Sequence, residues 1–328
     1  MRLTIARLAI ALCALLYGAP LVVEAQGKTV RIGVLDAVGM ASNEANLSAF
    51  RQGLRELGYV EGQNVVIEYR SADGRPERFP DLATELVRLK VDVIVTRGTS
   101  AALGAKHVTD TIPIVMASSG DPVFAGLVNS LARPGANVTG LHLITPPDLA
   151  GTRLRLLKEV IPGLSRVGVL LDSGDVYSRL MMKEIEKVAH EIGVQLHSVD
   201  AQRPADFDRA FEAAILDRVD ALITVEGVLT ATDLGRIVDF AAMSRLPAIY
   251  GLREFVDAGG LMAYGTDLRD LFRRSATYVH RILNGARPGD LPVEPPAKFE
   301  LAINLKTAKA LGLTIPPSLL QRADYLAQ

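Results

Sequence analysis

A short strand motif occurs twice in the chain and decides the fold: residues 31–36 read RIGVLD, and residues 166–172 read RVGVLLD. Two further pairs of segments match in the same order and at a similar offset: 90–96 (KVDVIVT) with 218–224 (RVDALIT), and 112–114 (IPI) with 246–249 (LPAI). Buried strands resemble one another, so one match carries little weight. Three matches in register indicate that one structural unit is repeated.

Within each unit, short β-branched runs alternate with helical patterns. Apolar residues spaced three and four apart predict an amphipathic helix, which Gly58 ends: Leu47, Phe50, Leu54 and Leu57. Strands that alternate with helices favour a parallel sheet covered on both faces. The sequence therefore predicts an α/β fold of two Rossmann-like lobes with parallel sheets.

The C-terminal fifth of the chain extends this pattern. A long amphipathic helix is predicted at 268–283, followed by a proline-rich stretch, a strand at 299–304 and a helix at 305–311. We expect the tail to cross between the lobes. The predicted parts are residues 28–143 plus 268–284 for lobe one, 144–267 plus 295–328 for lobe two, and 285–294 for a crossover segment.

The N-terminus is typical of a signal peptide. Arg2 and Arg7 precede an apolar run, and residues 23–25 (VEA) predict cleavage after Ala25. The apolar run is short for a membrane span, although an uncleaved anchor is the alternative. The only cysteine, Cys13, lies inside this segment, and the residues around it do not favour a lipoprotein. We expect residues 1–25 to be removed and the protein to be periplasmic, soluble and cysteine-free.

Several function classes find no support in the sequence. The net charge is −1, with no basic region typical of nucleic-acid binding. Dinucleotide-binding, Walker-type and G-x-S-x-G nucleophile motifs are absent. The five histidines form no H-E-x-x-H or H-x-H pair, so we expect neither a metal nor a cofactor.

Polar residues follow the predicted strands, at the edge where open parallel sheets bind ligands. In the first unit these candidates are Asp36, Thr99, Ser100, Ser118, Ser119 and Asp121. The loops at 96–100 and 117–122 each precede a predicted helix, whose free N–H groups suit a carboxylate. Plain helix capping by Thr99 or Asp121 is the alternative, and the two remain open.

The second unit offers groups for the other end of a zwitterion. Asp172 and Glu226 are candidate acceptors for an ammonium group, and Tyr250 is a candidate ring to cover a ligand. The alternatives are a solvated Glu226 and a Tyr250 in the core. Arg97, if it faces the ligand, favours a dianion or an aromatic acid instead.

Longer segments resemble the ABC-type substrate-binding proteins of the TrpX-related, tryptophan/tyrosine-binding group. The resemblance is carried by 98–99 (GT), 120–123 (GDPV), 133–140 (RPGANVTG), 149–154 (LAGTRL), 246–251 (LPAIYG), 253–262 (REFVDAGGLM), 299–308 (FELAINLKTA) and 312–320 (GLTIPPSLL). It covers essentially the whole mature chain. Three loops depart from the family's pattern, at Ser118–Ser119, at 172–175 and at 225–227, and the ligand is therefore left open.

The resemblance implies a type I periplasmic-binding fold with three crossovers, and a monomeric receptor that closes around an amino acid or another small carboxylate. It also implies an ABC permease and an ATPase as partners, and no enzymatic activity. Two alternatives remain: an α/β enzyme with Asp36, Asp121 or Glu226 as acid–base groups, and a sensory module without transport.

Overall fold

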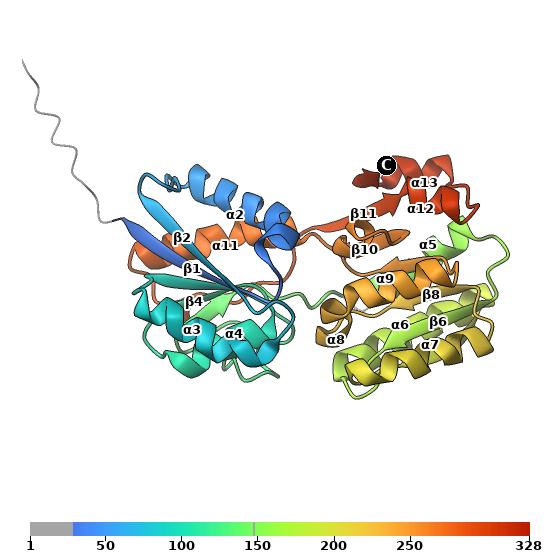
Figure 1. The fold of residues 1–328 in the computed structure, drawn as a ribbon, viewed down its shortest axis with the longest axis horizontal. Helices are drawn as coiled ribbons and strands as arrows, with labels where there is room; N and C mark the ends of the chain where they lie inside the picture. Colours follow the sequence, from blue (N-terminus) through green and yellow to red (C-terminus); the bar gives the residue numbers. More distant parts are fainter. Residues whose placement is uncertain (1–28, 147) are drawn as a thin grey trace, which may run out of the picture.

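The computed structural model describes residues 29–146 and 148–328. The predicted signal peptide and Cys13 lie outside the described residues. Two lobes lie side by side, each built from a sheet between layers of helices (Figure 1). Within the described part of the chain, no helix is both long and apolar enough to cross a membrane.

The first lobe contains a five-stranded parallel sheet in the order β2-β1-β3-β4-β5. The 3-10 turns η1 (Met40–Asn43) and η2 (Pro76–Arg78) precede α2 and α3. Helices α2 and α11 cover one face of the sheet, and α3 and α4 cover the other. The bounds are β1 Val30–Asp36, β2 Val65–Ser71, β3 Val93–Arg97, β4 Ile114–Ser118, β5 Val138–Gly140, α2 Glu44–Glu56, α3 Phe79–Arg88, α4 Thr99–Val108 and α11 Leu268–Leu283.

Helices α2 and α11 pack closely although they are far apart in sequence. A Cβ atom at Gly53 would lie 2.5 Å from the backbone oxygen of Arg273 and 2.9 Å from the Cβ of Ala276. Glu56 accepts a hydrogen bond from Arg273 at 2.7 Å at the end of this contact. The absence of a side chain at Gly53 therefore sets the distance between the two helices.

The second lobe contains a seven-stranded sheet in the order β12-β11-β10-β9-β8-β6-β7. Strand β11 runs antiparallel to β10, and β12 pairs parallel with β11. The strands are β6 Arg166–Leu171, β7 Gln195–Asp200, β8 Ala221–Thr224, β9 Ala248–Tyr250, β10 Met262–Thr266, β11 Phe299–Asn304 and β12 Tyr325–Ala327. The helices are α5 Asp148–Val160, α6 Val176–Ile192, α7 Phe207–Leu216, α8 Val228–Thr232, α9 Leu234–Met243, α10 Glu254–Asp257, α12 Leu305–Ala310 and α13 Pro317–Arg322, with the 3-10 turns η3 Pro204–Asp206 and η4 Pro288–Asp290.

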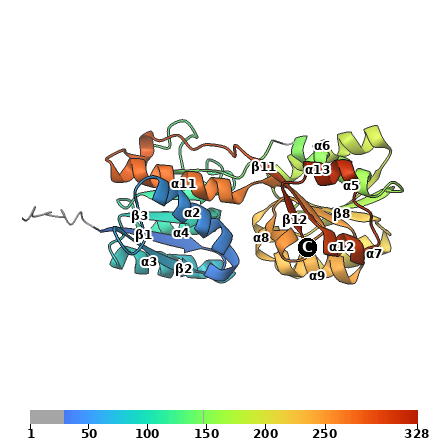
Figure 2. The same ribbon diagram turned by 90° about the horizontal axis from the view of Figure 1, so that it is seen from above.

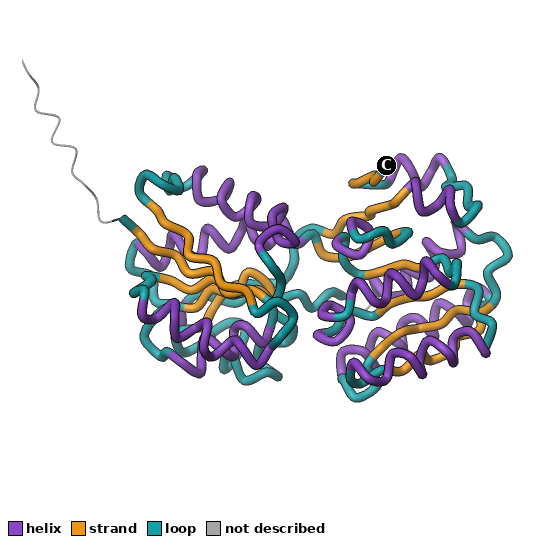
Figure 3. Tube along the Cα trace, viewed as in Figure 1, coloured by secondary structure: helices purple, strands orange, loops and turns teal. Residues whose placement is uncertain are grey.

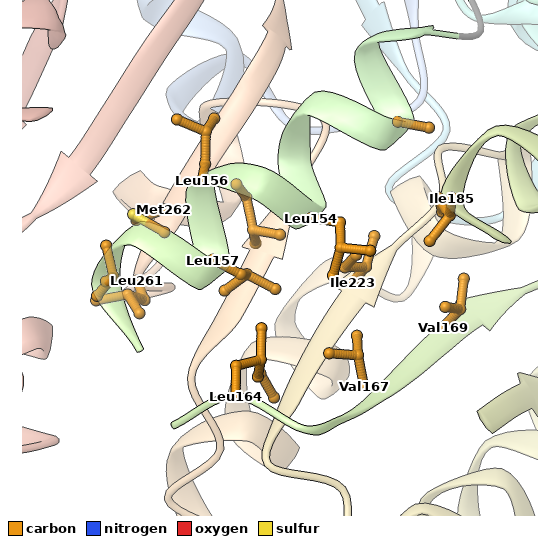
Figure 4. Packing of buried hydrophobic residues seen from close by; sticks show 14 of the residues in the cluster. Leu154, Leu156, Leu157, Leu164, Val167, Val169, Ile185, Ile223, Leu261 and Met262 are labelled. Atoms are coloured by element: carbon orange, nitrogen blue, oxygen red, sulfur yellow. The ribbon is translucent and has the colours of Figure 1, made fainter. Parts of the chain in front are cut away.

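The core of the second lobe is divided by its sheet. Helices α5 and α6 pack on one face, and α7 and α9 pack on the other. Figure 4 shows Leu154 and Leu157 of α5 packed towards Val167 of β6 and Ile223 of β8. Such burial of branched side chains stabilises the lobe by about 1.5–3 kcal/mol per fully buried residue.

The chain passes three times between the lobes, as predicted. It leaves β5 after Gly140 for α5, returns from β10 through Asp267 to α11, and leaves α11 through residues 284–298 for β11. Figure 2 shows the third passage, and in Figure 3 no helix runs from one lobe into the other. Lobes joined only by loops and strand ends can rotate about these segments.

The predicted fold class is confirmed, with two local differences. The tail strand at 299–304 runs antiparallel to its neighbour, because the chain enters the lobe from the opposite side. The prediction of a helix after the loop at 117–122 is wrong: residues 122–126 form turns, and Gly126 has a φ of 68°. The exact lobe boundaries stay a prediction.

Candidate functional site

The carboxyl ends of the strands in the two lobes face each other. Arg97 ends β3 in the first lobe, and its guanidinium donates a 3.2 Å hydrogen bond to Glu254, which begins α10 in the second lobe. Asn46 of α2 donates to the same carboxylate oxygen at 3.2 Å. These contacts bring together the two sheet edges at which the sequence predicted ligand-binding residues.

Asp36 is a buried anchor on the first edge. Its carboxylate accepts hydrogen bonds from the side chain of Asn43 and the backbone of Val38, and lies 3.6 Å from the Arg97 guanidinium. Burial raises the pKa of Asp36, and the charge of Arg97 acts against that rise. The structure thus shows Asp36 organising its own lobe. A ligand contact stays a prediction.

Hydroxyl groups gather where α4 begins. Oγ1 of Thr99 accepts a 2.9 Å hydrogen bond from the Gly120 backbone N–H and lies 3.3 Å from Oγ of Ser119. Ser118 and Ser119 are buried, whereas Ser100 is half-buried. The contacts of Thr99 join the ends of β3 and β4. Its side chain does not cap α4, whose N-cap is Gly98.

Asp121 shapes the turn after β4. Its carboxylate accepts hydrogen bonds from the backbone N–H groups of Val123 at 2.9 Å and Phe124 at 3.0 Å. Its charge also acts on His142, although burial prevails and lowers the pKa of that imidazole. The capping alternative for Asp121 therefore applies to a turn rather than to a helix.

A buried ion pair defines the second edge. Arg153 of α5 is fully buried, and its guanidinium donates hydrogen bonds to both carboxylate oxygens of Glu226, with Nη1 at 2.6 Å from Oε2. Nε of Arg153 donates a 2.7 Å hydrogen bond to the backbone oxygen of Tyr264 in β10. Burial acts to lower the pKa of Arg153, and the charge and hydrogen bonds of Glu226 outweigh it and raise that pKa.

Glu226 lies at a small hollow on this edge. The hollow is lined by Thr224, Glu226, Gly227, Thr230, Ala231, Gly251, Leu252 and Phe255. Oγ1 of Thr224 is buried and has no hydrogen-bond partner among the described residues. Buried hydroxyls are normally satisfied, so this atom is available to a polar group that enters the hollow.

Two predicted residues of this lobe occupy different settings. Asp172 follows β6 and accepts a hydrogen bond from the Gly174 N–H at 2.8 Å, in an accessible loop. Tyr250 is fully buried, and its ring stacks on Phe255 with centroids 4.5 Å apart. Burial also raises its pKa. The setting of Tyr250 is that of the core alternative, and its ligand contact stays a prediction.

Sequence reasoning missed Arg153 and Glu254. Arg153 falls on the apolar stripe of α5, four residues after Leu149 and four before Leu157. A charged residue at such a position is a signal for a buried ion pair. Glu254 gave no comparable signal, because its partner Arg97 belongs to the other lobe.

A second ion pair joins α11 to β11, close to the segments where the chain passes between the lobes. Glu300 of β11 is buried, and accepts a 2.6 Å hydrogen bond from Arg269 of α11. Burial raises the pKa of Glu300 to about 7; the negative charge of Asp267 adds to this, and Arg269 and Arg253 oppose it. Among the described residues, no three His, Cys, Asp or Glu side chains are grouped so that they could hold a metal ion.

Comparisons with known proteins place these features in context. The family model described as ABC transporter substrate binding protein matches residues 31–326. A tyrosine-binding protein of Clostridioides difficile is 27% identical over 286 residues, which are 87% of this chain and 82% of the relative.

Solved structures of binding proteins are similar to this chain. An ABC domain from Streptococcus pneumonia in complex with L-Trp is 28% identical, with a TM-score of 0.77 over 91% of this chain and 100% of that one. An arabinose-binding protein from Geobacillus stearothermophilus, at 14% identity, has a TM-score of 0.57 over 83% of this chain and 96% of its own. The last likeness concerns the fold alone, because the architecture accommodates different ligands.

Proposed function

Since the chain belongs to the ABC transporter substrate-binding protein family, we propose that it captures an amino acid between its two lobes. Members of this family are binding proteins rather than enzymes, and they act outside the cytoplasm. Relatives of this chain bind tyrosine and L-Trp. We extend the proposal to delivery of the ligand to an ABC permease driven by an ATPase.

The observation that carries the amino-acid proposal is the chemical complementarity of the two edges. The first edge offers the N–H groups and hydroxyls at the start of α4, around Thr99 and Ser119, which suit a carboxylate. The second edge offers the Glu226 carboxylate, which suits an ammonium group. A zwitterion presents both of these charges.

The cross-lobe contact supports the facing arrangement of these groups. Arg97 lies two residues before Thr99, and Glu254 lies three residues after Gly251, which borders the Glu226 carboxyl group. The Arg97–Glu254 hydrogen bond joins the loop that contains Thr99 in the first lobe to the segment beside Glu226 in the second lobe. This contact supports the proposal that a ligand lies between Thr99 and Glu226. Ligand contacts with both lobes would favour the closed arrangement by the difference in affinity for the two states.

The charges already present argue against a dianionic ligand. Arg97 is held by Asp36 and Glu254, and Arg153 is held by Glu226, so both cations are committed to carboxylates. Asp121 and Asp172 add negative charge at the same edges. Of the two alternatives, a zwitterion and a dianion or aromatic acid, this arrangement favours the zwitterion, because Arg97 and Arg153 are already paired with carboxylates.

A thermal-shift screen tests the proposal. We would heat the mature protein with L-tyrosine, L-tryptophan, other amino acids, aromatic acids without an amine, nucleosides and sugars. A ligand that binds the native state raises the midpoint by mass action. We expect an amino acid to raise it. A response confined to neutral sugars or nucleosides would contradict the amino-acid proposal while leaving the family assignment intact.

A further inference from the structure

Arg153 is among the largest fully buried side chains of the molecule, and its hydrogen bonds are directed to two groups. One is the backbone oxygen of Tyr264, and the other is the carboxylate of Glu226. A buried guanidinium is costly unless it is paired and hydrogen-bonded, and here both requirements are met. Arg153 is too deeply buried to serve as a surface contact for a ligand.

The partner of Arg153 is placed differently. The Glu226 side chain retains 18% of its exposure and lines the hollow with Thr224. A carboxylate has about four lone-pair sites, and a guanidinium fork uses one on each oxygen. Acceptor capacity therefore remains on Glu226, which lines the same hollow as Thr224, whose hydroxyl has no hydrogen-bond partner within the described part of the chain.

Two glycines make room for this arrangement. A Cβ atom at Gly251 would overlap the carboxyl group of Glu226. A Cβ atom at Gly265 would collide with the backbone oxygen of Gly251 and lie 3.2 Å from Nη2 of Arg153. The backbone at the ends of β9 and β10 is thus shaped around the ion pair, which fixes where the carboxylate can lie.

We propose that Arg153 is a positioning residue, which holds Glu226 as a fixed acceptor so that the site selects ligands bearing an ammonium group. This inference rests on the proposed function, since it concerns the same edge. Its distinct content is that selectivity for the amine depends on a residue that the ligand does not touch. A flexible glutamate without this fork would lose orientational selectivity, because it would have to be ordered again on binding.

The test compares an amino acid with its deaminated analogue. We would measure by calorimetry the Kd of L-tryptophan and of indole-3-propionate, and in parallel of L-tyrosine and 3-(4-hydroxyphenyl)propionate. We expect wild type to prefer the amine by about 10- to 100-fold, the range of one hydrogen bond to a charged group. This preference is the readout, because a merely structural defect weakens both members of a pair equally.

The variants are Arg153→Met, Arg153→Lys and Glu226→Gln, and Arg155→Met is the matched control. Arg155 lies two residues along α5, and is exposed in a pair with Glu191. We expect Arg153→Met and Glu226→Gln to lose most of the preference, Arg153→Lys to retain a reduced preference because it keeps the charge without the fork, and Arg155→Met to match wild type. If Arg153→Met does not fold, Arg153→Lys carries the comparison.

The outcomes are distinct. Folded Arg153 variants that weaken the amino acid and its analogue by the same factor would overturn the role of Arg153 alone. A wild-type protein that binds no amino acid would overturn the proposed function, and this inference with it. Loss of the amine preference in the Arg153 variants, with an intact preference in Arg155→Met, supports the proposal.

Discussion

Replacing Gly251 by alanine should break the ion pair at the second edge without touching either charged residue. The new methyl group would occupy the space of the Glu226 carboxyl group and displace it. Glu226 can rotate away, but Arg153 is fully buried and would be left without its partner. Breaking a buried ion pair from one side costs about 3–5 kcal/mol, and the partial exposure of Glu226 reduces our expectation to about 2–4 kcal/mol.

The effects of Gly251→Ala and Glu226→Ala on the free energy of unfolding should therefore be strongly coupled. Glu226→Ala alone should cost a similar amount, because it also leaves Arg153 unpaired. Adding Gly251→Ala to Glu226→Ala should cost little more, since the carboxyl group is already gone. The double-mutant cycle should therefore show a coupling energy of about 2–4 kcal/mol.

Urea unfolding followed by far-ultraviolet circular dichroism measures these free energies. The chain contains no tryptophan, so tryptophan fluorescence is no alternative. Gly235→Ala is the control: a Cβ atom there meets nothing within 4 Å, and alanine inside α9 should stabilise by about 0.5–1 kcal/mol. Costs for Gly251→Ala and Glu226→Ala that simply add would refute the reasoning, because independent sites do not share a partner.

Three further changes probe the lobes and the crossings. The pKa of Glu300 is raised to about 7 in the folded state, so its contribution to stability is greatest below the ordinary value near 4.5 and is lost as the pH rises to about 7; Glu300→Gln should flatten the fall in unfolding free energy, of up to about 3 kcal/mol, measured between pH 5 and pH 7.5. Gly53→Ala should cost about 1–3 kcal/mol in urea unfolding, because it forces α2 away from the Arg273 backbone. Glu254→Gln should weaken the tie to Arg97 and increase the radius of gyration in small-angle scattering.

Each of these three predictions has a control or an outcome that would contradict it. If the unfolding free energy of wild type and of Glu300→Gln falls equally between pH 5 and pH 7.5, a group other than Glu300 causes the fall. Gly163→Ala, where a Cβ meets nothing within 4 Å, should leave stability unchanged, and an equal effect at Gly53 would contradict the close packing. Glu85→Gln removes an ion pair with Arg70 within one lobe, and it should not alter the scattering curve.

The sheets could be predicted because buried parallel strands require apolar runs, which the repeated segments supply. The long helix α11 could be predicted to its last residue, because its apolar stripe ends at Leu283. The segment after Asp121 could not, since Asp121 followed by Pro122 is compatible with either a helix or a turn. Its carboxylate is used by a turn that Gly126 continues.

At the candidate site, sequence position alone predicted that Glu226 lies at the sheet edge, because residues that follow parallel strands gather there; its contact with a ligand stays a prediction. Sequence position could not identify how Glu226 is held, since Arg153 lies 73 residues earlier and in a helix. The burial of Tyr250 was also undetermined, because an aromatic at a strand end fits either a core or a ligand site. Pairings over such distances depend on the packing of whole elements.

The packing of α2 against α11 has a consequence for the order in which the chain folds. Glu56 and Arg273 meet across 217 residues of chain, and the apolar cluster around Leu47, Phe50 and Leu54 of α2 contains residues of the sheet and of α11. A nascent or truncated chain that ends before Leu268 would therefore expose the part of this cluster that α11 covers. Closing so long a loop delays the contact until late in folding. Limited proteolysis of truncated chains should find the N-terminal unit labile until α11 is present, although it comes first in the sequence.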